Sequence, residues 1–142
     1  MLWLSTSKQI RVLCTGGEPL LQLDSDLISA FKEEGFYIAI ETNGTLPAPK
    51  GIDWICMSPK ANTNIKLKSG NEIKVIHPQE NYDPNDFMSF DFDDFYIQPM
   101  DSKSYSKNLK ASLDFCMQNP RWSLSLQTCL LYTSDAADDV AS

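Results

Sequence analysis

The residues Gly16, Gly17 and Glu18 form the segment of this sequence that is best suited to holding a ligand. Two adjacent glycines let the backbone approach a ligand closely, because no Cβ stands in the way. The carboxylate beside them can accept hydrogen bonds from a cationic group such as an ammonium. Pro19 restricts Glu18 to an extended backbone. We interpret the segment as a ligand cradle after a strand, with an ordinary strand-to-helix turn as the alternative.

Three further polar motifs follow apolar runs of the strand type. They are residues 41–44 (Glu-Thr-Asn-Gly), 58–60 (Ser-Pro-Lys) and 98–101 (Gln-Pro-Met-Asp). The carboxyl ends of parallel strands meet at one edge of a sheet, which is where ligands bind in α/β folds. We therefore expect all four motifs to form one rim and a binding site.

These motifs carry side chains that suit a polar, zwitterionic ligand with a ribose or a fused heterocycle. Glu18 and Glu41 can bind cationic groups or relay a proton. Lys60 offers a point charge, and Gln98 and Asp101 can bind hydroxyls or ring nitrogens. A solvated loop lysine is the alternative interpretation of Lys60.

The elements that must position these motifs alternate along the chain. Hydrophobic patterns predict strands at residues 9–14, 36–41, 54–57, 72–76, 95–97 and 122–126, and helices at 24–34 and 104–118. Asp24 or Ser25 can begin the first helix and Gly35 can end it. Such alternation predicts an α/β fold with a mainly parallel sheet.

Composition excludes several classes of function. The net charge of -7 disfavours a nucleic-acid partner, which would require clustered lysines and arginines. No apolar run approaches the ~18 residues of a membrane span, and the first residues make a poor signal peptide, so we expect a cytoplasmic protein with no membrane partner. The four cysteines have no metal-site spacing, so we predict no metal ligand, and we expect His77 to be structural or solvent-facing.

Together the four motifs resemble the radical S-adenosylmethionine (SAM) superfamily and, within it, the 7-carboxy-7-deazaguanine synthases, from about Val12 to Thr128. Gly-Gly-Glu-Pro alone indicates only the superfamily. The other three motifs and residues 121–128 narrow the resemblance to the 7-carboxy-7-deazaguanine synthases. It implies an incomplete (β/α) barrel and a lyase that converts 6-carboxy-5,6,7,8-tetrahydropterin to 7-carboxy-7-deazaguanine in queuosine biosynthesis. It also implies SAM, a [4Fe-4S] cluster, Mg²⁺, a flavodoxin- or ferredoxin-type reductant and a homodimer.

The resemblance also implies roles for individual residues. Thr15 would contact the pterin substrate, and Glu41 is the candidate catalytic residue, as a substrate contact or proton relay. The residues implied to bind SAM are Gly17, Glu18, Ser58, Pro59, Lys60, Gln98, Pro99, Met100 and Asp101.

Two departures from the family pattern set further expectations. The cysteine triad that holds the cluster precedes the Gly-Gly-Glu-Pro block in the family and has no counterpart before Ile10, and the magnesium-binding hydroxyl and a substrate-binding arginine are absent with it. After Thr128 the family continues with His-Lys, where this chain has Cys129. We therefore expect a partial barrel domain at 1–128, a disordered non-native tail at 129–142, and a truncated chain that is poorly stable, binds no cluster and does not turn over.

Two alternatives stay open on the sequence. One is another radical SAM enzyme, such as a glycyl-radical activase, which would share Gly-Gly-Glu-Pro but not the other motifs. The other is a non-catalytic domain that binds a nucleotide-like ligand at the same rim.

Overall fold

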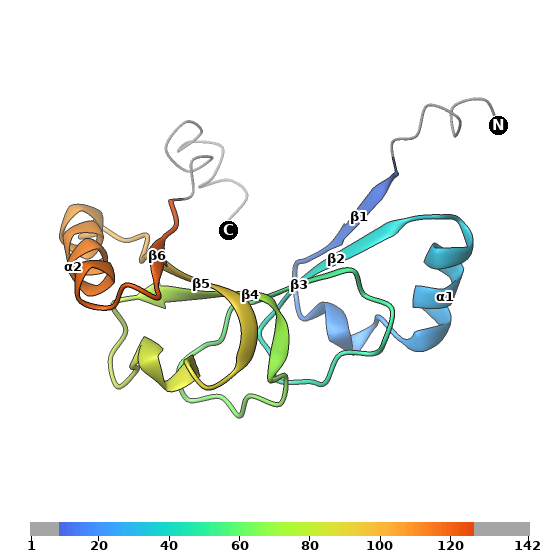
Figure 1. The fold of residues 1–142 in the computed structure, drawn as a ribbon, viewed down its shortest axis with the longest axis horizontal. Coiled ribbons are helices and arrows are strands. Elements are labelled where there is room, and N and C mark those ends of the chain that lie inside the picture. Colours follow the sequence, from blue (N-terminus) through green and yellow to red (C-terminus); the bar gives the residue numbers. More distant parts are fainter. Residues whose placement is uncertain (1–8, 127–142) are drawn as a thin grey trace.

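The computed structural model describes residues 9–126, and these form one parallel six-stranded sheet with two α-helices (Figure 1). The strand order is β1-β2-β3-β4-β5-β6, so each strand pairs in parallel with the one before it. The strands are β1 (Arg11–Cys14), β2 (Tyr37–Thr42), β3 (Trp54–Met57), β4 (Ser69–His77), β5 (Asp91–Pro99) and β6 (Ser123–Leu124). The helices are α1 (Ser25–Glu33) and α2 (Tyr105–Gln118), with short 3-10 turns η2 (Pro19–Leu21) and η3 (Pro84–Phe87).

This consecutive order confirms the α/β fold with a parallel sheet that the sequence predicts. It is also the order in which a (β/α) barrel adds its strands. Figure 1 shows α1 beside β1 and β2 at one end of the sheet and α2 beside β5 and β6 at the other. Within residues 9–126, no helix is long and apolar enough to cross a membrane.

Helix α1 has the boundaries that its sequence signals predict. The Asp24 side chain accepts a hydrogen bond from the Leu27 N–H at 2.9 Å, which satisfies one of the free donors at the helix start. Gly35 follows the helix with φ 80°, a conformation that glycine adopts without steric cost. Ile28 is buried between this helix and the sheet.

Two clusters of buried side chains form the core. One lies under α1 and contains Ile38 and Ile40 of β2, both fully buried. The larger one surrounds β4 and β5 and contains Ile73, Val75, Phe95, Ile97 and Trp122. Ile55 of β3 packs against both clusters, so the central strand joins the two halves of the molecule.

The structure differs from the predicted strands in their lengths, whereas both helices lie where they were predicted. Strands β4 and β5 extend well beyond 72–76 and 95–97, and β6 is shorter than 122–126. Only the β1–β2 and β5–β6 connections contain an α-helix. The β2–β3 connection contains Pro47 and Pro49, which cannot occupy a helix interior.

Candidate functional site

The carboxyl ends of β1, β2 and β3 surround a cavity of about 580 Å³. Its lining combines the first three motifs predicted to form the rim: Thr15, Gly16, Gly17, Glu18, Glu41, Thr42, Asn43, Ser58 and Lys60. Three segments distant in sequence therefore meet at one polar hollow, as expected for parallel strands that end at the same edge.

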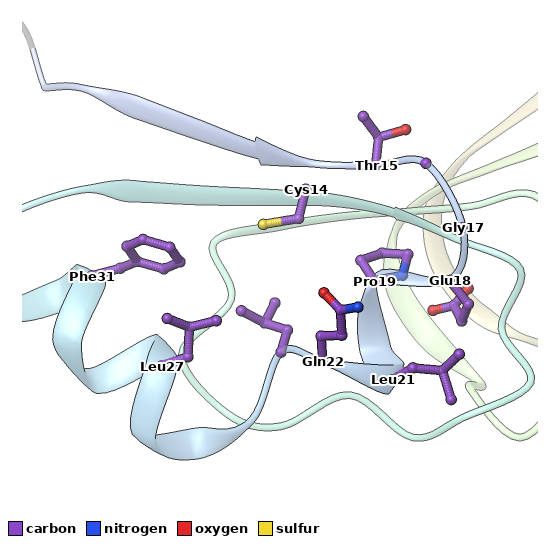
Figure 2. Close-up of a pocket in the computed structure, with 11 residues that line it drawn as sticks. Cys14, Thr15, Gly17, Glu18, Pro19, Leu21, Gln22, Leu27 and Phe31 are labelled. Atoms are coloured by element: carbon purple, nitrogen blue, oxygen red, sulfur yellow. The ribbon is translucent and has the colours of Figure 1, made fainter.

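Gly16 and Gly17 turn the chain away from β1 with left-handed backbone conformations. Their φ angles are 73° and 44°, which residues with a side chain adopt only at a cost. A Cβ built on either glycine would meet no atom within 4 Å, so their small size leaves open space beside the cavity. Figure 2 shows this loop between β1 and η2. The geometry suits the close approach of a ligand to the backbone.

The Glu18 carboxylate ties the glycine loop to the end of β2. Its Oε2 accepts hydrogen bonds from the Thr42 hydroxyl at 2.6 Å and the Leu20 N–H at 3.0 Å. Its Oε1 accepts a third hydrogen bond from the Asn43 N–H at 2.8 Å. Because an ionised carboxylate offers about four acceptor positions, Glu18 has one position left for a cationic group.

Thr15 and Glu41 lie side by side across the β1–β2 pair. The Thr15 hydroxyl donates to Glu41 Oε2 at 3.4 Å, and both side chains are exposed at the cavity. Figure 2 shows Thr15 pointing away from the helix side of β1, whereas Cys14 points toward α1. The predicted substrate contact and the candidate catalytic carboxylate are thus neighbours on the face opposite α1.

The Ser-Pro-Lys motif follows β3, and only part of it lines the cavity. Ser58 and Lys60 face the cavity, while Pro59 is buried behind them. The Ser58 N–H donates to the Thr42 carbonyl at 2.7 Å, which fixes the start of this loop to β2.

The fourth predicted motif lies at the same edge of the sheet but does not line this cavity. Gln98 and Pro99 end β5 and are buried, and Asp101 is exposed. Strand β4 separates them from the motif on β3. The Met100 carbonyl accepts a hydrogen bond from Asn108 Nδ2 of α2 at 2.9 Å, so helix α2 holds this segment in place.

A second hollow of about 300 Å³ lies between β1 and α1 and shares the glycine loop with the first (Figure 2). Its walls carry the apolar side chains of Leu21, Leu27 and Phe31. Leu21 is 74% exposed. The loop of Gly16 to Glu18 therefore forms a wall between a polar hollow and a largely apolar one.

The described cysteines do not fit an iron–sulfur cluster. Cys14, Cys56 and Cys116 lie on β1, β3 and α2, and within residues 9–126 no three potential ligands are close enough to hold a metal ion. Burial raises the thiol pKa of all three, that of Cys56 to about 12 with a further contribution from Glu72. Metals bind the thiolate, so raised pKa values disfavour ligation. Cys129 and the predicted tail lie outside the described residues, as does Thr128.

Several residues of this region were given no individual role from the sequence, among them Thr42, Asn43 and Tyr82. Thr42 lines the cavity and binds both Glu18 and Ser58, although it lies within a recognised motif. Tyr82 donates its hydroxyl hydrogen to the Pro59 carbonyl at 2.7 Å from a loop after β4. A single tyrosine in a polar loop carries no sequence signal that would assign it to the site.

No protein-family model matches the sequence. The chain is 49% identical over 127 residues to a 7-carboxy-7-deazaguanine synthase of Burkholderia multivorans, with 89% of this chain and 60% of the relative covered. It is 50% identical over 117 residues to the enzyme of that name from Caulobacter vibrioides, with 82% and 56% covered. A relative of the same name from Bradyrhizobium diazoefficiens is 44% identical over 126 residues, with 89% and 60% covered.

The fold matches a solved structure as well. The crystal structure of QueE from Escherichia coli superposes with a TM-score of 0.63 at 24% identity, over 89% of this chain and 60% of that one. At this identity the match supports the fold alone. The fold and the sequence relatives agree, so the chain is a homologue of the 7-carboxy-7-deazaguanine synthases and spans about 60% of their length.

Proposed function

We propose that this chain contributes the SAM-binding and substrate-binding rim of a 7-carboxy-7-deazaguanine synthase. The observation that carries the proposal is the polar cavity at the ends of β1, β2 and β3, which combines the glycine loop with two carboxylates and a lysine. The identity of up to 50% to proteins of that name supports this assignment. The family resemblance implies the reaction, the contraction of 6-carboxytetrahydropterin to 7-carboxy-7-deazaguanine. SAM is the cofactor in this proposal and, on one-electron reduction, would supply the radical chemistry of the reaction.

The residues of the rim have distinct roles in the proposed site. Gly17 lets the methionine part of SAM lie against the backbone, and the free acceptor position of Glu18 binds its ammonium. Lys60 binds the SAM carboxylate. Thr15 and Glu41 face the substrate, where Glu41 accepts or relays a proton. Gln98, Pro99, Met100 and Asp101, at the carboxyl end of β5, hold the nucleoside part of SAM.

The remaining components of the reaction are proposed to come from outside the described residues. Within residues 9–126, no group of side chains is arranged to hold a [4Fe-4S] cluster or Mg²⁺. No step of the reaction is therefore assigned to this chain through either group. A flavodoxin- or ferredoxin-type reductant, a homodimer and a cytoplasmic location stay predictions of the family resemblance.

SAM binding tests the proposal through two glycines with matched backbones. Gly17 and Gly35 have φ angles of 44° and 80°, and a Cβ on either meets no atom within 4 Å, but only Gly17 lines the cavity. Ala at either position therefore carries similar backbone strain. We expect Gly17→Ala to weaken SAM binding at least about tenfold, equal to ~1.4 kcal/mol, and Gly35→Ala to leave it within about twofold, measured by isothermal titration calorimetry.

The outcomes of this titration are distinct. An unaltered chain that binds no SAM contradicts the proposed function. SAM binding that is weakened equally by both substitutions shows that strain rather than contact is responsible, and it removes Gly17 from the site.

A further inference from the structure

The Ser-Pro-Lys loop is held by a residue from a different part of the chain. Tyr82 follows β4 and donates its hydroxyl hydrogen to the Pro59 carbonyl at 2.7 Å. Its ring packs against Phe87, with centroids 5.6 Å apart, which fixes the direction of the hydroxyl. Burial raises the pKa of the Tyr82 hydroxyl, so this group is a neutral hydrogen-bond donor throughout the physiological range.

The end of the same loop is closed by Thr63. The Thr63 hydroxyl donates to the Lys60 carbonyl at 2.7 Å. Between them Asn62 adopts a left-handed conformation with φ 62°, which asparagine tolerates better than most residues. The carbonyls of Pro59 and Lys60 are therefore both fixed by hydroxyl groups outside residues 58–60.

Packing alone provides limited support for this loop. Lys60 is exposed and lines two hollows, the rim cavity and another of about 320 Å³ that is also lined by Tyr82 and Phe87. A segment with open space on both sides has few neighbours to fix its conformation, so its hydrogen bonds decide where it lies. The Tyr82 ring lines the second hollow and not the rim cavity, so it acts on the site through Pro59.

We propose that Tyr82 is a positioning residue of the rim, whose hydroxyl fixes the Pro59 carbonyl and thereby orients Ser58 and Lys60 toward the ligand. The inference rests on the proposed SAM site and goes beyond it, because it assigns a role to a residue that touches no ligand. A hydrogen-bonded path then runs from Glu18 through Thr42 to the Ser-Pro-Lys loop and ends at Tyr82.

The test compares Tyr82→Phe with Tyr105→Phe in the 142-residue chain. Both residues are half-buried tyrosines, and within residues 9–126 the Tyr105 hydroxyl has no hydrogen-bond partner. Loss of one hydrogen bond worth 0.5–1.5 kcal/mol corresponds to a change of roughly 2- to 10-fold. We expect Tyr82→Phe to speed exchange of the Ser58 amide, whose N–H donates to the Thr42 carbonyl, by that factor without ligand, and to weaken SAM binding similarly. Tyr105→Phe should change neither quantity.

Thr63 provides a second position, and because its side chain is exposed to solvent, we expect its replacement to leave folding intact. Thr63→Val removes the hydroxyl and should weaken SAM binding, whereas Thr63→Ser keeps it and should restore the affinity. If the Thr63 hydroxyl only stabilised the fold, its removal would lower the urea midpoint of unfolding. SAM affinity would then not be lost in Thr63→Val and restored in Thr63→Ser.

Each outcome decides the inference. If the unaltered chain binds SAM and Tyr82→Phe binds it equally well, the positioning role is overturned while the SAM site stands. If the unaltered chain binds no SAM, the proposed function fails, and the positioning role fails with it. The inference is supported if amide exchange in the Ser-Pro-Lys loop is faster in Tyr82→Phe than in the Tyr105→Phe control. SAM affinity should then be reduced in Tyr82→Phe alone.

Discussion

Glu18 combines a structural role with the proposed ligand-binding role. Its carboxylate accepts hydrogen bonds from Thr42, Leu20 and Asn43, so it fixes the glycine loop against β2 before any ligand arrives. Preorganised groups bind a ligand with less loss of conformational freedom. The residue that the sequence suggests as an ammonium partner thus also holds the shape of the cavity.

Replacement of this carboxylate by an amide tests the structural role. Glu18→Gln keeps the size of the side chain, but its NH₂ group faces a hydrogen-bond donor from Thr42, Leu20 or Asn43. Hydrogen bonds to charged groups contribute about 1.5–3 kcal/mol, so we expect the free energy of unfolding to fall by about 1–3 kcal/mol in urea titrations. Glu33→Gln, on the exposed side of α1, is the control, and equal stability of the two variants would contradict the role.

At the scale of elements, α2 packs on β4 and β5 through a face that mixes apolar and polar side chains. Asn108 and Ser112 are the buried residues of this helix, whereas its apolar residue Leu113 is 43% exposed. Asn108 donates to the Met100 carbonyl and Ser112 to the Asn108 carbonyl, so both polar groups are satisfied in the interior. Hydrophobic periodicity could not identify this face, because its polar members are paired only in the folded structure.

The predicted and observed boundaries of the strands and helices agree best where buried positions carry apolar side chains. Strand β2 and helix α1 differ from their predicted ranges by about one residue at each end, because their buried positions carry apolar side chains. Strands β4 and β5 continue into the polar residues Ser69, Gly70 and Asp91, whose backbone pairing leaves no hydrophobic signal. The meeting of the first three motifs at one cavity was predictable from the parallel-strand rule, but the fourth motif does not line that cavity. The Tyr82 anchor depends on the path of a loop.

His77 makes the packing of α2 sensitive to pH. Its ring lies 5.1 Å from that of Phe115, and its buried Nδ1 has no hydrogen-bond partner within residues 9–126. Burial lowers the pKa of His77 below its usual value, against an opposing contribution from Asp83. A lowered folded-state pKa means that the unfolded chain takes up the proton first as pH falls, so stability present above pH ~6.5 is lost on acidification.

We therefore expect the free energy of unfolding to fall between pH 7 and pH 5 in the unaltered chain and to fall less in His77→Phe. Phe keeps a ring beside Phe115 but cannot be protonated. His77 is the one histidine of the sequence, so no second imidazole titrates in this window. Urea titrations at pH 7, 6 and 5 measure the difference, and parallel pH dependences of the two proteins would contradict the assignment.

At the scale of the whole molecule, β1 is the outermost strand on its side of the described sheet. It pairs with β2 alone within residues 9–126, and its Leu13 side chain is 58% exposed on the face opposite α1. An outer strand with unpaired backbone groups and exposed apolar side chains is a template for pairing with another chain. The expectation that the isolated chain is poorly stable or aggregates stays a prediction.

Leu13→Lys tests whether this edge causes association. Lysine on an edge strand opposes edge-to-edge pairing, so we expect less light scattering on concentration and little change in the free energy of unfolding. Met117→Lys is the control, because Met117 is 79% exposed but lies on α2, away from any strand edge. If Met117→Lys suppresses association as strongly as Leu13→Lys, the added charge rather than the edge of β1 is responsible. If neither variant alters association, β1 is not the contact surface.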